Sequence, residues 1–248
     1  MADNKRKKQK TDYICEYLPS AGKEAFKRLR TNLQFTFTEE GECRVVGITS
    51  SHPSEGKSTT AINLAYSLAQ LDIKVLLIDA DMRRASIDQK LDLDLRPGLS
   101  NLLTDVNSSG GTIKSYEPSD ESVGFNVITA GDAPPNPSEL LNSERLNRLL
   151  ARLRTMFDYI VVDLPPVGAV VDAQTLSQRV DGMIIVVREN NTTTMMLGEC
   201  ISQLKLTNAK ILGFVVNGAD DSAQSRYGKY GKYGKYGSYG KYGSYYYK

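Results

Sequence analysis

Short runs of apolar, mostly aliphatic residues recur along the chain, with polar stretches between them. They cover residues 45–49, 75–79, 127–129, 159–163, 183–187 and 211–217. Apolar residues at consecutive positions are typical of strands that are covered on both faces. Between several runs the apolar positions have helical spacing, most clearly after Pro137 and Ser138, at Leu146, Leu149, Leu150, Leu153 and Phe157. The pattern predicts an α/β fold with a mostly parallel β-sheet and helices on both faces, in which ligands bind beyond the carboxyl ends of the strands.

Three other stretches do not fit this alternation. Residues 94–111 and 115–124 are rich in Gly, Ser, Asp and Pro, and we expect them to be surface connections. From Arg226 onwards, tyrosines recur at every third position, with Gly and Lys or Ser between them, and two more follow: Tyr227, Tyr230, Tyr233, Tyr236, Tyr239, Tyr242, Tyr245, Tyr246 and Tyr247. Because this tail has no aliphatic residue to bury, we expect it to be disordered. The predicted organisation is a basic flexible arm (1–12), one globular domain (13–225) and a Tyr-rich tail (226–248).

Composition narrows the chemistry that this domain can support. Of the 248 residues, 40% are hydrophobic and 24% are charged, which is typical of a globular protein. His52 is the only histidine, which argues against a Ser-His-Asp triad, a His-rich zinc site and an iron facial triad. The three cysteines form no C-x-x-C pair, so we expect small buried side chains in a reducing compartment.

Charge is distributed unevenly along the chain. Residues 1–10 carry five basic groups and one acid, and residues 226–248 carry six basic groups and no acid. The body between them, residues 11–225, holds 20 basic and 28 acidic groups, which argues against binding to nucleic acid. The basic arm fits either a solvated segment or contact with an anionic membrane surface. No apolar run reaches roughly 18 residues, so we expect no transmembrane helix, no signal peptide and a cytoplasmic location.

A phosphate-binding loop follows the first predicted strand. Residues 51–59 read SHPSEGKST, which is G-x-x-x-x-G-K-[ST] with Ser51 at the first glycine position. Such a loop directs backbone N–H groups and a lysine at phosphates, and its hydroxyl binds Mg²⁺. We expect Lys57 to lie in an exposed loop at the start of a helix. The predicted nucleotide contacts are Ser51, Ser54, Glu55, Gly56, Lys57, Ser58 and Thr59.

Acidic residues follow two other predicted strands. Asp79 and Asp81 lie at the end of one, and Asp163 lies at the end of another, before Pro165. In a parallel sheet these ends reach the edge where the phosphate loop lies, and clustered carboxylates are costly unless a cation neutralises them. The sequence therefore predicts a P-loop NTPase fold that binds ATP and Mg²⁺, with Ser58, Asp79 and Asp163 as metal ligands. The alternative for Asp163 alone is a helix N-cap.

These motifs, together with residues 131–141 (GDAPPNPSELL) and the Tyr-rich tail, resemble the bacterial tyrosine kinases of capsule and exopolysaccharide synthesis. The resemblance implies ATP-dependent autophosphorylation of the tail tyrosines in trans. It implies three kinds of partner: other copies of the chain in a ring, a membrane-embedded polysaccharide co-polymerase that activates the kinase at the inner face of the membrane, and a phosphotyrosine phosphatase. It further implies that Asn217 contacts adenine.

The resemblance also extends to a helix that joins subunits in this family through an E-x-x-R-x-x-R pattern. Here the matching residues are Glu24, Lys27 and Arg30, which lie on one helical face. Lys27 departs from the pattern, because a lysine cannot make the bidentate contact of an arginine. A solvated helix face is the alternative.

The expected catalytic residues are Lys57, Asp79, Asp81, Asp163 and Arg83. Lys57 holds the β- and γ-phosphates, and either Asp79 or Asp81 accepts the proton of the tyrosine hydroxyl. Arg83 either neutralises developing charge or contacts a neighbouring subunit, unless it is simply a surface arginine.

Two rival functions use the same fold. A positioning or partitioning ATPase has a second lysine just after the first residue of the loop, where this chain has His52, and has no use for nine tail tyrosines. A non-catalytic scaffold with an adhesive tail would not need Lys57, Ser58 and the three aspartates together.

Overall fold

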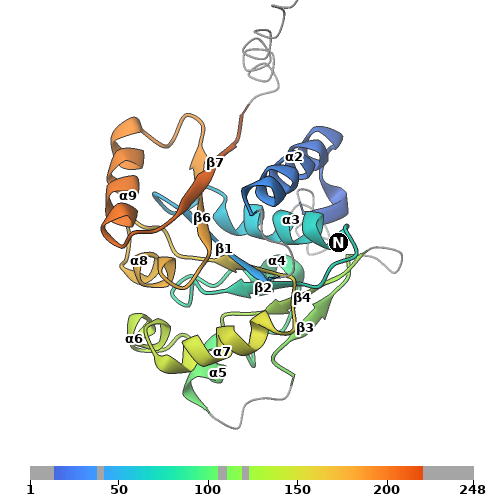
Figure 1. Cartoon of the computed structure of the whole chain (residues 1–248), viewed down its shortest axis with the longest axis vertical. Coiled ribbons are helices and arrows are strands. Elements are labelled where there is room, and N and C mark those ends of the chain that lie inside the picture. Colours follow the sequence, from blue (N-terminus) through green and yellow to red (C-terminus); the bar gives the residue numbers. More distant parts are fainter. Residues whose placement is uncertain (1–13, 38–41, 106–110, 119–122, 220–248) are drawn as a thin grey trace, which may run out of the picture. The chain divides into compact units, whose positions relative to one another are not determined.

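The computed structural model describes residues 14–37, 42–105, 111–118 and 123–219. In these residues a seven-stranded sheet has the order β3-β4-β2-β5-β1-β6-β7 (Figure 1). The strands are β1 (Arg44–Ser50), β2 (Val75–Asp79), β3 (Lys114–Tyr116), β4 (Phe125–Ile128), β5 (Tyr159–Asp163), β6 (Gly182–Arg188) and β7 (Ile211–Asn217). All neighbours are parallel except β3 and β4, which confirms the predicted sheet.

Helices cover both faces of the sheet (Figure 1). One face carries the short 3₁₀ helix η1 (Cys15–Tyr17) and the α-helices α2 (Ser20–Thr36), α3 (Lys57–Ala69) and α4 (Ile87–Leu91). The other face carries α5 (Leu99–Thr104), α6 (Pro137–Leu141), α7 (Glu144–Arg154), α8 (Asp172–Ser177) and α9 (Thr194–Leu206).

Two hydrophobic cores result, because successive side chains of a strand point to opposite faces. In β1, Val45 belongs to the core under α5–α9, and Val46 belongs to the core under α2–α4. All five β2 residues are buried, as the run of consecutive apolar residues predicted. This double cover fixes the register of the central strands, since a slip by one residue would exchange the two faces.

The register brings the expected chemistry to one edge. Asp79 at the end of β2 lies directly opposite Asp163 at the end of β5, and Ile48 of β1 is paired with the same Asp163. The β1 strand runs between β5 and β6 and leads into the phosphate loop. The loop therefore emerges next to both carboxylates.

Three elements differ from the sequence prediction. Residues 94–111 contain the helix α5, whose Leu99 and Leu103 are buried, and residues 115–124 overlap the strand β3, where Tyr116 packs on Phe125. The helix expected to begin after Pro137 is divided into α6 and α7, because Ser143 caps a new helix by accepting from the Leu146 N–H. The polar residues around these short elements hid them in the sequence, and packing on the rest of the fold reveals them.

The predicted arm (1–12) and the predicted Tyr-rich tail (226–248) lie outside the described residues. The compact unit that carries the sheet ends at Asn217. Among the described helices, none combines the length and the apolar character that a membrane span requires. Cys15 and Cys200 are buried as expected, whereas Cys43 is half-buried.

Candidate nucleotide-binding and phosphoryl-transfer site

The phosphate loop connects β1 to α3, and its backbone turns through left-handed conformations at Ser54 (φ 65°) and Gly56 (φ 98°). The Gly56 position has no room for a side chain, because a Cβ atom there would lie 1.9 Å from Nδ2 of Asn217. Gly56 caps α3, which begins at Lys57 as predicted. The first turn of this helix therefore points unpaired N–H groups toward the loop, as an anion-binding site requires.

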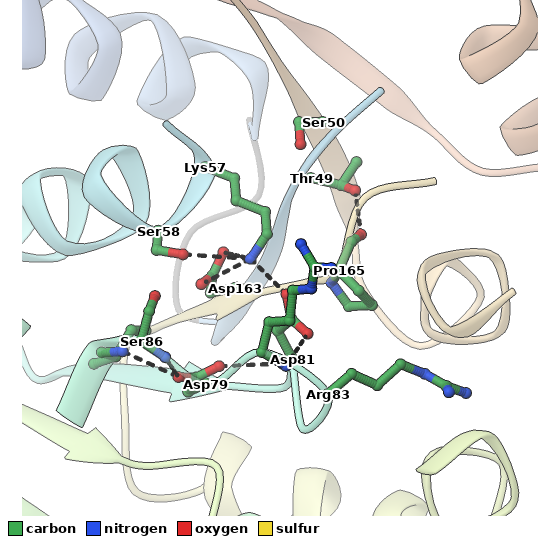
Figure 2. Close-up of polar contacts among 12 residues, drawn as sticks. Thr49, Ser50, Lys57, Ser58, Asp79, Asp81, Arg83, Ser86, Asp163 and Pro165 are labelled. Carbon is green, nitrogen blue, oxygen red and sulfur yellow. Dashed lines mark hydrogen bonds and ion pairs between the residues drawn. The ribbon is translucent and has the colours of Figure 1, made fainter. Parts of the chain in front are cut away.

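Lys57 is buried rather than exposed, contrary to the sequence expectation (8% exposed). Its Nζ lies 2.9 Å from Oδ2 of Asp81, 3.4 Å from each Oδ of Asp163 and 3.3 Å from Oγ of Ser58 (Figure 2). Burial opposes its charge, but the surrounding carboxylates outweigh burial and raise the pKa of Lys57. The lysine is the cation that balances this acidic cluster.

Asp79 and Asp81 have different roles although they are two residues apart. Oδ1 of Asp79 accepts from the Asp81 N–H (3.1 Å), and its Oδ2 accepts from the N–H groups of Ser86 and Ile87 (3.2 Å each). Asp81 directs Oδ2 at Lys57, while its Oδ1 accepts from the Arg84 N–H (3.0 Å). Asp79 thus holds the backbone after β2, and Asp81 faces the cavity described below.

Both buried carboxylates at the paired strand ends are difficult to ionise. Burial, with a contribution from Asp163, raises the pKa of Asp79 to about 7. Burial also raises the pKa of Asp163, against the opposing effects of Lys57 and of a hydrogen bond from Ser58. Two carboxylates side by side in a buried site disfavour each other's charge. A bound cation would stabilise the ionised form of both carboxylates, so the pair is suited to a site that binds a cation.

A cavity of about 240 Å³ opens between the loop and the segment after β2. The predicted residues Ser54, Gly56, Lys57, Ser58, Thr59 and Asp81 line it, together with residues that the sequence reasoning did not single out: Pro53, Arg84, Ser86, Lys90 and Pro166. Arg84 directly follows Arg83, so the sequence could have suggested it as a second basic candidate. Lys90 lies on α4, and only the fold brings it to the cavity.

Magnesium fits this site in the manner usual for phosphoryl transfer. Within the described ranges, no three His, Cys, Asp or Glu side chains are grouped so that they could hold a metal ion by themselves. Mg²⁺ in such sites binds one or two protein oxygens and otherwise phosphate oxygens and water. Ser58 and Asp163, whose side chains are hydrogen-bonded, provide such a pair. Of the predicted ligands, Asp79 is less available than Asp163, because its two oxygens already accept three backbone N–H groups.

Arg83 is not brought together with the other predicted catalytic residues. Its side chain points away from Lys57 (Figure 2). Its Nε lies 2.9 Å from Oδ2 of Asp172, at the start of α8, and its Nη2 lies 3.2 Å from Oγ of Ser138 in α6. Asp172 is buried, and this contact raises the pKa of Arg83. The arginine thus joins the segment after β2 to α6 and α8.

The other predicted nucleotide contacts lie on the β6 and β7 side of the loop. Ser51 and Glu55 are buried, and Nδ2 of Asn217 donates to the Glu55 carbonyl (3.1 Å). Two further residues that the sequence analysis missed contact the loop: Nη1 of Arg188 donates to the Ser54 carbonyl (2.9 Å), and Oγ1 of Thr192 donates to Oε1 of Glu55. More than 130 residues separate each from its partner, so local sequence gives no signal for them.

The three residues of the expected subunit contact all lie on α2. Glu24 and Lys27 are exposed, and Arg30 is half-buried. Nη1 of Arg30 donates to the Ser67 carbonyl near the end of α3, so this arginine has a partner within the chain. The predicted phosphorylation sites, Tyr227 to Tyr247, lie outside the described residues.

The chain is similar to known proteins in sequence and in fold. The family described as an AAA domain matches residues 43–212. The tyrosine-protein kinase YwqD of Bacillus subtilis is 36% identical over 209 residues, which cover 84% of this chain and 86% of the relative. The solved kinase domain of the Escherichia coli tyrosine kinase ETK superposes with a TM-score of 0.75 at 32% identity, covering 83% of this chain and 80% of that one.

A solved structure of lower sequence identity comes from a site-determining protein, the class of protein considered above as a rival. The septum site-determining protein MinD of Pyrococcus horikoshii superposes with a TM-score of 0.59 at 21% identity, covering 72% of each chain. At this level of identity the likeness shows a shared fold alone.

Proposed function

The chain belongs to the family of bacterial protein-tyrosine kinases, and from this premise we propose that it transfers the γ-phosphoryl group of ATP to tail tyrosines of a neighbouring copy of itself. The observation that carries the proposal is the grouping of Lys57, Ser58, Asp81 and Asp163 around the phosphate loop, within 3.4 Å of the Lys57 Nζ. Phosphoryl transfer depends mainly on positioning and charge neutralisation, which these residues are suited to provide.

In the proposed reaction, Lys57 leaves the carboxylates and binds the β- and γ-phosphate oxygens of ATP. Asp81 then loses its ion pair and accepts the proton of the tyrosine hydroxyl. The phenolic oxygen forms the new bond to the γ-phosphorus, the bond to the β–γ bridging oxygen breaks, and ADP leaves with that electron pair. We favour Asp81 over Asp79 as the base because only Asp81 lines the cavity. Ser58 and Asp163 would hold Mg²⁺, which would supply charge neutralisation at the phosphates.

The proposed substrate is the Tyr-rich tail, which also acts as a switch. Residues 226–248 carry six basic groups, whereas residues 11–225 have an excess of eight acids, so the unmodified tail is attracted to the body of a neighbour. Each phosphate adds about −1.5 to −2 charges, so about four or five of the nine tyrosines must react before the six positive charges are exceeded and the tail becomes acidic. The acidic tail is then repelled and the assembly loosens.

The proposed assembly is a ring of identical copies joined through α2. Glu24 and Lys27 are exposed and suited to pair with a neighbour. Glu24→Ala combined with Lys27→Ala should convert the oligomer into monomers without unfolding it, as light-scattering mass would show. Arg30 stays unchanged in this test, because its contact with Ser67 within the chain would confuse assembly with stability.

The remaining partners follow from the family. We propose a cytoplasmic kinase that a membrane-embedded polysaccharide co-polymerase recruits to the inner face of the membrane and activates. A phosphotyrosine phosphatase resets the tail, and the cycle regulates capsule or exopolysaccharide synthesis.

A complementation assay tests transfer between copies. The acceptor is the full chain with Lys57→Met, and the donor is the full chain with all nine tail tyrosines replaced by Phe. Neither alone should form phosphotyrosine with Mg-ATP and the cytosolic segment of the activator, whereas the mixture should label the acceptor. An unlabelled mixture, beside a wild-type control that labels itself, would rule out transfer in trans.

A further inference from the structure

Glu55 lies in the phosphate loop but does not face the cavity. The cavity is lined by its neighbours Ser54 and Gly56, while the Glu55 side chain is fully buried behind the loop. Oε2 of Glu55 accepts from Oγ of Ser51 (3.0 Å) and from the His52 N–H (2.9 Å). The carboxylate thus bridges the first and last parts of the loop.

The charge of this carboxylate is satisfied by hydrogen-bond donors. In the part of the chain that the structure describes, no ion pair joins Glu55 to a Lys, Arg or His. A buried carboxylate without a cation is costly, so each of its donors matters. Two donors come from the loop itself, and the third is the Thr192 hydroxyl, which binds Oε1.

Thr192 is itself firmly held. It lies in the turn that joins β6 to α9, where its Oγ1 accepts from the Arg188 N–H (2.8 Å) and its own N–H donates to the Arg188 carbonyl (2.9 Å). The hydroxyl accepts from Arg188 and donates its single proton to Glu55. Arg188 also donates to the Ser54 carbonyl, so this turn contacts the loop at two successive residues.

We propose that the contact between Glu55 and Thr192 is a positioning device that fixes the phosphate loop in its nucleotide-binding shape. Glu55 lies between Ser54 and Gly56, which both have left-handed backbone conformations. The contact thus holds the loop at the point where the backbone turns so that the loop N–H groups converge. The contact therefore sets the affinity for Mg-nucleotide and leaves the rate of phosphoryl transfer unchanged. By thermodynamic reciprocity, bound nucleotide stabilises residues 188–193 in return. The inference rests on the proposed function only in identifying the ligand as a nucleotide.

Matched variants of Thr192 in the full chain test this role. Thr192→Val removes the hydroxyl and keeps the shape, Thr192→Ser keeps the hydroxyl, and Glu189→Gln is an exposed control in the same turn. Binding of a fluorescent ADP analogue with Mg²⁺ should weaken about tenfold in Thr192→Val, equivalent to about 1.4 kcal/mol. The Ser variant should stay within about twofold of wild type. At saturating ATP, the rate of tail phosphorylation should change less than about twofold in Thr192→Val.

Hydrogen exchange gives a second readout. Mg-ADP should slow exchange of residues 188–193 in wild type and slow it less in Thr192→Val. Unchanged affinity in Thr192→Val would overturn the inference, as would equal losses in the Val and Ser variants or a loss confined to the maximal rate. The binding measurement does not require the kinase reaction. If wild type binds nucleotide but forms no phosphotyrosine, the proposed function fails, whereas a tenfold loss of affinity in Thr192→Val still supports the positioning role.

Discussion

The two sides of the phosphate loop both bury carboxylates, but they satisfy them in different ways. On the β2–β5 side, which we call the acidic side, Asp79, Asp81 and Asp163 surround Lys57. On the β6–β7 side, which we call the bracing side, the described donors to Glu55 are neutral, among them Thr192. Among the described residues, Lys57 is the cation that forms ion pairs on the acidic side, whereas the donors that Glu55 has on the bracing side are neutral groups.

This difference indicates which side changes when a ligand binds. A lysine shared by carboxylates exchanges one set of anionic partners for another when phosphates arrive, and two aspartates with raised pKa values favour added positive charge. The hydrogen bonds to Glu55 are already formed before the ligand binds, so the ligand stabilises them without changing their partners. We therefore expect the acidic side to carry the chemistry and the bracing side to carry affinity.

The largest effect should follow from Lys57→Met. Loss of its charge at the phosphates should reduce tail phosphorylation at least a thousandfold, within the range typical of a lost charge in phosphoryl transfer. Because Lys57 balances buried carboxylates, we also expect the free energy of unfolding to fall by about 3–5 kcal/mol. Phosphotyrosine blotting and urea titration at pH 8 measure the two effects.

Lys74→Met is the matched control, because Lys74 is exposed at the opposite end of β2. It should label itself at the wild-type rate and unfold at the wild-type urea concentration. Wild-type labelling in Lys57→Met would refute the kinase mechanism. Wild-type stability in Lys57→Met would show that the acidic side does not depend on its lysine.

The next largest effect concerns the metal. Asp163→Asn keeps the size of the side chain and removes its charge, so the Mg²⁺ concentration for half-maximal phosphorylation should rise about tenfold or more. Raised Mg²⁺ should restore part of the rate. Asp79→Asn should not be restored in this way, because Asp79 binds the backbone of Ser86 and Ile87. Equal responses of the two variants to Mg²⁺ would contradict the separate roles.

A pH-dependent effect on stability should follow from Asp79. Its pKa of about 7 in the folded protein is above the value of about 3.9 expected in the unfolded chain. The folded protein therefore binds the extra proton between about pH 4 and 7, and its free energy of unfolding falls as the pH rises through that range. Asp79→Asn should flatten this fall in urea titrations at pH 5, 6, 7 and 8.

The exposed Asp72 provides the control for this titration. Asp72→Asn should keep the wild-type dependence on pH. A wild type whose stability rises from pH 5 to 7, or an Asp79→Asn variant with the full wild-type fall, would show that Asp79 is not the group responsible.

The smallest effect is expected on the bracing side. Arg188→Gln removes the hydrogen bond to the Ser54 carbonyl and leaves the contact between Glu55 and Thr192 in place. One hydrogen bond from an exposed arginine should change nucleotide affinity only about two- to threefold and stability by less than about 0.5 kcal/mol. Isothermal titration with Mg-ADP measures the first quantity. If Arg188→Gln lowered the free energy of unfolding as much as Lys57→Met does, the two sides of the loop would not differ in the way that we describe.

Much of the acidic side could be predicted from sequence, because its signals are local. A buried strand followed by Gly56 and Lys57, and acids at the ends of two other strands, need only the rule that parallel strand ends share an edge. The burial of Lys57 could not be predicted, since it depends on Asp81 and Asp163 meeting in space. A loop lysine by itself gives no sign of its partners.

The bracing side could not be predicted, for a different physical reason. Glu55 and Thr192 are 137 residues apart in the sequence. The sequence by itself also does not show whether a glutamate is buried or exposed. The short elements α5 and β3 were missed because they lie in otherwise polar segments, where α5 buries only a few side chains and β3 has half-buried and exposed ones. Interactions of this kind become visible only once the strand order is known.

The fate of the γ-phosphate tests the central claim most directly. Purified full chain is incubated with Mg-ATP labelled at the γ-phosphorus and with the cytosolic segment of the proposed activator, and the label on inorganic phosphate and on each tyrosine is measured. The account predicts that the early label appears on tyrosines between Tyr227 and Tyr247 and that it disappears in Lys57→Met. Release of the label as inorganic phosphate, with no phosphotyrosine, would contradict the account and indicate a positioning or partitioning ATPase.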